Sequence, residues 1–160
     1  MKPLTTLAAL AASMMFIGSA GAQRDAAAKD TNELVGTWTP VSSSAYGANP
    51  RGILIFAPDG RYSLTLLRQS LPKFAANSRL QGTAEENQAV VHGSITHFGK
   101  YAIEDGGKTL AMNIEGSTYP NWDGATQKRP FTVSGDTLSY KVATPSAGGS
   151  AGETVWRRAK

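Results

Sequence analysis

The chain has 160 residues, a formal net charge of +4 at neutral pH and no cysteine. The lack of cysteine excludes disulfide bonds and a lipid-modified N-terminal cysteine. The basic residues are scattered and form no long stripe, so tight binding to a nucleic-acid phosphate backbone is not expected.

The N-terminal segment has the pattern of a secretory signal peptide. Lys2 precedes an apolar run over residues 7–17, and the small residues Ala20 to Ala22 follow it. The apolar run is too short to cross a bilayer, so stable membrane insertion is not expected, although an N-terminal anchor is the alternative. We expect residues 1–22 to be cleaved near Ala22, residues 23–33 to form a flexible arm, and the product to be secreted or periplasmic.

Residues 34–160 form one predicted domain of short β-strands. Apolar and polar residues alternate in segments that turn signals such as Pro58-Asp-Gly60 separate. The predicted strands comprise residues 34–43, 52–57, 61–68, 95–104, 109–116, 127–133, 137–143 and 153–159. A capping box, formed by Thr83 and Glu86, predicts a short helix over residues 84–91, between the third and fourth strands.

The order of these elements favours a closed sheet. Strands follow one another with short turns and do not alternate with helices, which disfavours a parallel sheet. An open antiparallel sheet of this size would leave exposed edges, and closure into a barrel removes them. We therefore predict an all-β fold, an eight-stranded antiparallel barrel whose interior is either filled or holds one small ligand.

The first and last strands are expected to meet at a plug of the barrel. Gly36 and Trp38 share one face of the first strand, and Trp156 and Arg158 share one face of the last. In a closed barrel these strands are neighbours, so the Arg158 guanidinium can lie on the Trp38 indole and bind backbone carbonyls. Gly36 leaves room for a close approach.

Several motifs in order resemble the lipocalin-like domain family of bacteria and fungi, in the calycin superfamily. They are "LVGTW", "GILIFAPDGRYSL", "GTAEE", "FGKYAIE", "YPNWDGATQKRPF", "GDTLSY" and the final "VWRR". The resemblance implies a lipocalin barrel with an interior pocket. Members often have histidines in the strand before the Pro-Asn-Trp segment, where this chain has Met112 and Asn113.

Inward-facing positions supply the candidate ligand contacts. They combine aromatic and aliphatic side chains with a few polar groups, which is typical of small-molecule pockets. The loop around Trp122 is either a structural corner or a lid over the cavity. The candidate ligand-binding residues are Tyr62, His97, Tyr101, Met112, Ile114, Trp122, Arg129 and Phe131.

Arg129 shares its strand face with Phe131, so it is expected to point inward. A buried guanidinium must meet a carboxylate, backbone carbonyls, water or an anionic ligand. Glu86 and Asp123 are the candidate carboxylates. The alternative is that Arg129 lies at the start of the strand and reaches solvent.

The favoured function is therefore an exported binding protein for a small apolar or amphipathic ligand inside the barrel. An isomerase or cyclase that uses His97, Tyr101 or Glu86 is one alternative, and a structural protein with a filled core is another. No cofactor is expected. The spacing of His92 and His97 is not typical of a zinc site, so no metal is expected either. The sequence leaves the oligomeric state open.

Overall fold

The computed structural model describes residues 33–160 of the chain. The predicted signal peptide and all but the last residue of the predicted arm lie outside the described residues. Within the described part, no helix combines the length and the apolar character that crossing a membrane requires.

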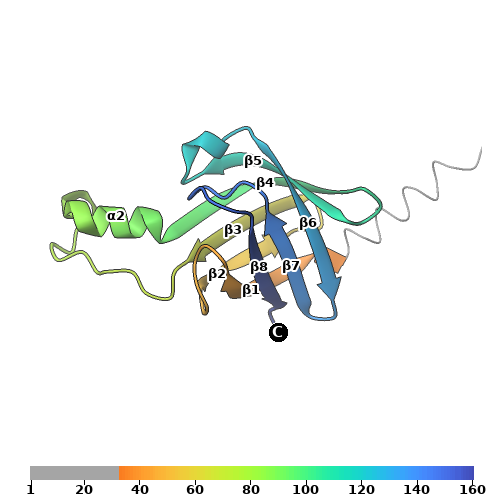
Figure 1. The fold of residues 1–160 in the computed structure, drawn as a ribbon, viewed down its shortest axis with the longest axis horizontal. Helices are drawn as coiled ribbons and strands as arrows, with labels where there is room; N and C mark the ends of the chain where they lie inside the picture. Colours follow the sequence, from red (N-terminus) through yellow and green to blue (C-terminus); the bar gives the residue numbers. More distant parts are fainter. Residues whose placement is uncertain (1–32) are drawn as a thin grey trace, which may run out of the picture.

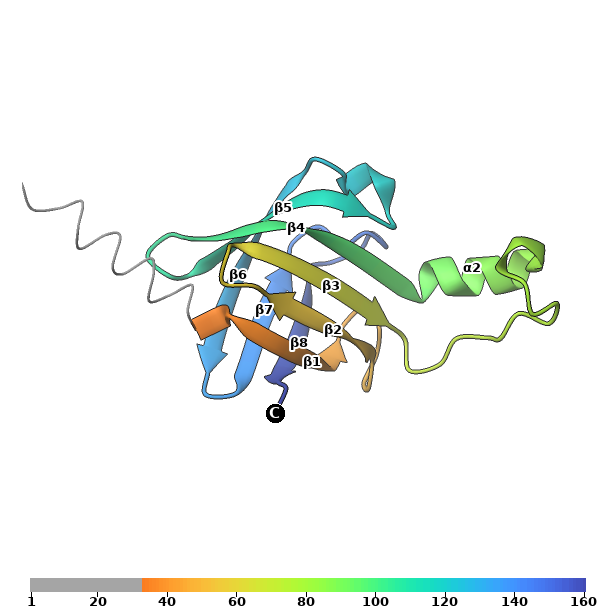
Figure 2. The same ribbon diagram turned by 180° about the vertical axis from the view of Figure 1, so that it is seen from behind.

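The described chain forms a closed antiparallel barrel, in which each strand pairs with the next and the last pairs with the first (Figures 1 and 2). The strands are β1 (Gly36–Ser43), β2 (Arg51–Phe56), β3 (Arg61–Leu67), β4 (Ser94–Glu104), β5 (Thr109–Ser117), β6 (Thr126–Ser134), β7 (Thr137–Val142) and β8 (Gly152–Arg158). Side chains alternate between buried and exposed along most of each strand. The predicted eight-stranded barrel is confirmed.

The predicted strand boundaries differ from the observed ones mainly at the first strand. β1 begins at Gly36 and not at Leu34, because Glu33 and Leu34 lie in a helical turn. Gly36 has a φ of +132°, which favours glycine, and it joins this turn to the strand. Leu34 is nevertheless fully buried, so the turn belongs to the core.

The helix α2 (Ala84–His92) lies between β3 and β4, where the capping box predicts it. The Thr83 hydroxyl accepts a hydrogen bond from the Glu86 amide at 3.2 Å, and the Glu86 carboxylate accepts one from the Thr83 amide at 2.9 Å. The helix projects away from the barrel wall in both views (Figures 1 and 2). Two short 3₁₀ helices, η1 (Arg79–Gln81) and η2 (Pro120–Trp122), lie in the connections.

The two ends of the barrel differ because the connections alternate along the chain. Tight turns over residues 57–60, 105–108 and 135–136 gather at one end, which we call the closed end. The longer connections gather at the other, the open end. They comprise residues 44–50, 68–93, 118–125 and 143–151.

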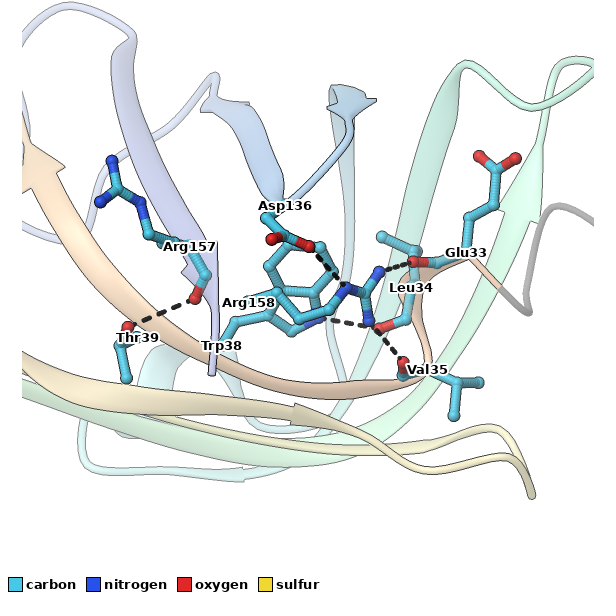
Figure 3. A network of polar contacts seen from close by, with 8 residues as sticks. All are labelled: Glu33, Leu34, Val35, Trp38, Thr39, Asp136, Arg157 and Arg158. Carbon is cyan, nitrogen blue, oxygen red and sulfur yellow. Dashed lines mark hydrogen bonds and ion pairs between the residues drawn. The ribbon is translucent and has the colours of Figure 1, made fainter. Parts of the chain in front are cut away.

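A stacked pair, Trp38 and Arg158, fills the closed end (Figure 3). Trp38 is fully buried, and the Arg158 guanidinium carbon lies 4.2 Å from the centroid of its ring. Arg158 also donates hydrogen bonds to the carbonyl oxygens of Val35 at 2.9 Å and Glu33 at 2.6 Å. The guanidinium thus has the π face and the backbone carbonyls that the sequence leads us to expect.

Two further contacts hold this plug in place. The Trp38 indole N–H donates to the Leu34 carbonyl at 2.8 Å (Figure 3). A Cβ atom at Gly36 would lie 3.1 Å from Arg158 Nη1, so glycine leaves space for the guanidinium. Glu33, at the start of the described chain, takes part in this plug through its backbone carbonyl.

Candidate ligand-binding site

A small cavity of about 50 Å³ lies inside the open end of the barrel, and we call it the inner cavity. Its wall combines aliphatic and aromatic side chains with a few polar groups. The residues that line it are Ser43, Ser44, Ala45, Tyr46, Leu64, Leu66, Ile95, His97, Trp122, Arg129, Tyr140, Val142, Pro145, Ser146, Gly152, Glu153 and Thr154.

Arg129 is the charged group in this wall that is most deeply buried, with 2% of its surface exposed. Its Nε and Nη2 atoms both donate to the Gln127 side-chain oxygen, at 3.2 and 2.6 Å. Nη2 lies 3.5 Å from His97 Nε2, and the guanidinium carbon lies 4.9 Å from the centroid of the Tyr140 ring. No carboxylate of residues 33–160 lies within ion-pair distance of Arg129.

The carboxylates considered as partners of Arg129 do not serve that role. Glu86 is engaged at the start of α2, where it accepts hydrogen bonds from the amides of Thr83 and Ala75. Asp123 is exposed and ends the turn of η2. Arg129 is buried and does not reach solvent at the start of β6, because its side chain turns inward beside Gln127.

His97 connects Arg129 to a second buried polar group. It is 1% exposed, and its Nδ1 atom lies 2.9 Å from the Tyr62 hydroxyl. Burial first, and then the charge of Arg129, lower the pKa of His97 to about 3, so the ring is neutral at physiological pH. Because Arg129 can only donate, its contact requires Nε2 to accept, and Nδ1 then donates to Tyr62.

Three of the predicted ligand-binding residues line the inner cavity, namely His97, Trp122 and Arg129. Trp122 is half-buried and meets the His97 ring edge-on, with centroids 5.8 Å apart. Tyr62 does not line the cavity and contacts it through His97. Trp122 therefore serves both as a corner of the η2 turn and as part of the wall.

The other four predicted residues lie away from the inner cavity. Tyr101 donates its hydroxyl to the Ala57 carbonyl at 3.0 Å, in a tight turn of the closed end. Met112 and Ile114 are buried, and Phe131 packs against the core. Strand alternation identifies which side chains point inward but does not separate those that line a cavity from those that pack together.

Residues that the sequence analysis missed complete the site. Tyr140 and Gln127 could have been found, because they lie two residues from Leu138 and Arg129 on the inward faces of their strands. Tyr46 and Ser146 lie in open-end connections with no periodic pattern. The sequence carries no signal that would place these two over the barrel.

A second hollow of about 430 Å³ adjoins the inner cavity, and we call it the outer recess. It shares Ala45, Tyr46, Ile95 and Ser146 with the inner cavity. Its lining consists of Ala45, Tyr46, Arg68, Val91, His92, Ser94, Ile95, Thr118, Tyr119, Ser146 and Ala147. The shared side chains therefore form the boundary between the barrel interior and the surface.

The described part of the chain contains no cluster of side chains that could bind a metal ion. Between residues 33 and 160, no group of three or more histidine, aspartate or glutamate side chains is placed to hold an ion. His92 and His97 also lie in different places, because His92 ends α2 at the outer recess and His97 lies inside the barrel.

Comparison with known proteins agrees with this architecture. A carrier protein for 4'-hydroxy-3'-methoxypropiophenone from Aspergillus oryzae is 28% identical over 89 residues, which is 52% of this chain and 80% of the relative. Residues 36–159, almost the whole barrel, match the lipocalin-like domain family. The motif resemblance is thus confirmed, and the chain belongs to the lipocalin-like domain family.

Proposed function

We propose that the protein binds a small, partly apolar ligand at the open end of the barrel. The observation that carries this proposal is the inner cavity, where the buried Arg129 and His97 face aromatic and aliphatic walls. Apolar walls with a few placed polar groups are the usual composition of a small-molecule site. The polar groups would orient one end of the ligand, and the apolar walls would bind the rest.

The volumes suggest how such a ligand would lie. The inner cavity, at about 50 Å³, is large enough for a polar head group but not for a whole aromatic compound. The remainder would extend past Tyr46 and Ser146 into the outer recess. Both of these residues lie in connections between strands, where small displacements cost less than in the sheet.

The similar carrier protein supports the same class of ligand. Its name specifies an aromatic ketone with a phenolic hydroxyl and a methoxy group. Such a compound is flat and mostly apolar, and it has oxygen atoms that can accept hydrogen bonds from a group such as Arg129. We propose that this chain carries a compound of comparable size and polarity.

The enzyme alternative depends on His97 alone. The other acid–base candidates are engaged elsewhere: Tyr101 donates a hydrogen bond at the closed end, and Glu86 accepts one at the start of α2. A histidine whose pKa is about 3 is a weak base, which does not favour proton abstraction near neutral pH. Recovery of the bound compound unchanged after prolonged incubation would support carriage, whereas a converted product would support catalysis.

Calorimetric titration with 4'-hydroxy-3'-methoxypropiophenone tests the proposed site. We expect saturable one-to-one binding, which Ser146→Trp weakens tenfold or more because the indole blocks the boundary between cavity and recess. Ser150→Trp is the matched control, since Ser150 is an exposed residue of the same connection and lines neither hollow. Equal affinity in both variants would place the ligand elsewhere.

We also propose that the protein acts after export. The basic start, the short apolar run and the small residues before Gln23 support this location. N-terminal sequencing of protein from the medium or periplasm should find a start near Gln23. Protein that remains inside the cell and retains Met1 would contradict the proposal.

A further inference from the structure

We propose that the ligand binds as an oxygen anion, a phenolate or a carboxylate, with the Arg129 guanidinium as its counter-charge. This inference rests on the proposed function, because it assigns the charge of the ligand at the same site. It follows from two properties of the barrel interior: hydrogen-bond donors outnumber acceptors there, and a buried positive charge has no negative partner.

The excess of donors is found among the side chains around Arg129. Gln127 supplies one acceptor oxygen, which already receives two hydrogen bonds, and the neutral His97 ring supplies one acceptor nitrogen. The hydroxyls of Tyr62 and Tyr140 can each donate. The buried indole N–H of Trp156 lies beside Tyr140 and outside the cavity wall, and it contacts the Tyr140 hydroxyl oxygen without a hydrogen bond of standard geometry, so it is a further donor to that oxygen. An anionic oxygen would supply the missing acceptor.

The positive charge of Arg129 is not cancelled by groups on the neighbouring strands. Burial raises the pKa of Tyr62 on β3 and of Tyr140 on β7, so both remain protonated and neutral. His97 on β4 is neutral. Tyr46, above the cavity, also has a pKa raised by burial.

Glu153 is the acidic residue in the cavity lining, but its carboxylate is engaged on the exposed side of its strand. Glu153 of β8 is exposed and accepts a hydrogen bond from the Ser139 hydroxyl at 2.6 Å. Glu115 of β5 pairs with Arg61 at 3.1 Å. A buried charge without a partner is costly, so a site that keeps one is suited to a ligand that supplies the opposite charge.

The route into the cavity is positively charged, as Arg129 is. Arg68 and His92 line the outer recess, and no aspartate or glutamate is among the described residues that line it. An anion that approaches through the recess therefore meets the Arg68 guanidinium before it reaches Arg129. Basic groups along an entry path raise the local concentration of anions.

The test uses 4'-hydroxy-3'-methoxypropiophenone, whose phenol lies para to a carbonyl and changes its absorbance on ionisation. Its pKa is measured free and bound to the full protein by absorbance titration. We expect binding to lower this pKa by about one unit or more, which corresponds to tenfold or more tighter binding of the phenolate than of the phenol. The observed affinity should rise with pH up to the pKa of the free compound and then stay constant.

Two further compounds and one variant separate the outcomes. The compound 3',4'-dimethoxypropiophenone has nearly the same shape but cannot ionise, so it should bind weakly and independently of pH. The anion of 3,4-dimethoxybenzoic acid tests whether a carboxylate replaces the phenolate. Arg129→Gln should remove the pKa shift and weaken binding of the phenolate more than binding of the dimethoxy ketone, and the wild-type pH profile gives the same answer if this variant does not fold.

Equal affinity for the ionisable and the non-ionisable ketone, at a pH where the first is ionised, would overturn the inference and leave the proposed function standing. Failure of all three compounds to bind would refute the proposed function, and this inference with it. An unchanged pKa shift in Arg129→Gln would also overturn it, because another group would then stabilise the anion.

Discussion

Two arginines on the inner face of the same barrel, one buried and one half-buried, have different surroundings. Arg158 stacks on Trp38 and donates to two backbone carbonyls, so its hydrogen bonds add to the closure of the barrel. Arg129 binds one amide side chain and has no carboxylate partner among residues 33–160. The sequence predicts that both arginines point inward. Only the structure shows that Arg158 has a full set of partners and that Arg129 lacks an opposite charge.

The plug should contribute strongly to stability. Trp38→Ala should lower the free energy of unfolding by about 3–5 kcal/mol, since it removes a large, fully buried ring. Arg158→Ala should cost about 2 kcal/mol or more through the lost stacking and hydrogen bonds. Arg157→Ala is the control, because its exposed side chain points outward and only its carbonyl is used, by the Thr39 hydroxyl (Figure 3). Denaturant unfolding of the three variants measures this, and equal losses for both arginines would contradict the plug.

His97 should make the fold sensitive to mild acid. Its folded pKa of about 3 lies below the unfolded value of 6.5, so the unfolded state binds more protons between these values. Its contribution is complete above pH 6.5 and is lost as the pH falls toward 3, at a slope approaching 1.4 kcal/mol per pH unit.

This dependence is measured as denaturant stability between pH 5 and 6.5, where few carboxylates titrate. His97→Gln should remove most of the slope in this range. His92→Gln is the matched control, because it replaces the exposed histidine at the end of α2. A slope that persists without His97 would show that another group titrates.

At the scale of the elements, sequence periodicity was sufficient to predict the strands and their inward faces. Alternation identified Tyr62 on β3 and Arg129 on β6 as inward-facing, and the capping box identified α2. It did not identify which inward residues line a cavity, because Tyr101 and His97 share the face of β4 and serve opposite ends of the barrel. Open-end connections have no period, so Tyr46 could not be placed over the interior.

The helix α2 should unfold locally and independently of the barrel. It projects from the wall and buries none of its residues fully, so its own cap is an important support. Thr83→Ala should weaken the helix by about 1 kcal/mol and speed amide hydrogen exchange over residues 84–92. The denaturation midpoint of the barrel should not change. Gln88→Ala is the control at an exposed position of the same helix and should not speed exchange. If Thr83→Ala also lowered the stability of the barrel, α2 would have to pack against the barrel.

Across the whole molecule, stability and binding are concentrated at opposite ends. The closed end has tight turns and the stacked Trp38–Arg158 pair, whose polar groups are satisfied. The open end has the long connections, the inner cavity and the incompletely paired Arg129. A barrel built this way can keep its sheet closed at one end while the connections adjust to a ligand at the other.

The two arginines provide a test of this division on the unliganded protein. Replacing a buried ion pair by apolar side chains of similar volume is often neutral or stabilising by about 1–4 kcal/mol, and a buried charge without an opposite charge lacks even the attraction that offsets its desolvation. Arg129→Met should therefore leave the free energy of unfolding unchanged or raise it by about 1–2 kcal/mol, although it removes the contact with Tyr140. Arg158→Met should lower it, because the carbonyls of Val35 and Glu33 lose their donor.

Thermal and denaturant unfolding of the two methionine variants, without ligand, gives the comparison. The variant that keeps or gains stability should also be the one that no longer lowers the pKa of a bound phenol. Such a trade of binding for stability is expected where a side chain is retained for function and not for the fold. Destabilisation of Arg129→Met to the same extent as Arg158→Met would show that Arg129 instead supports the barrel, since its bonds to Gln127 and its contact with Tyr140 would then outweigh the cost of its buried charge.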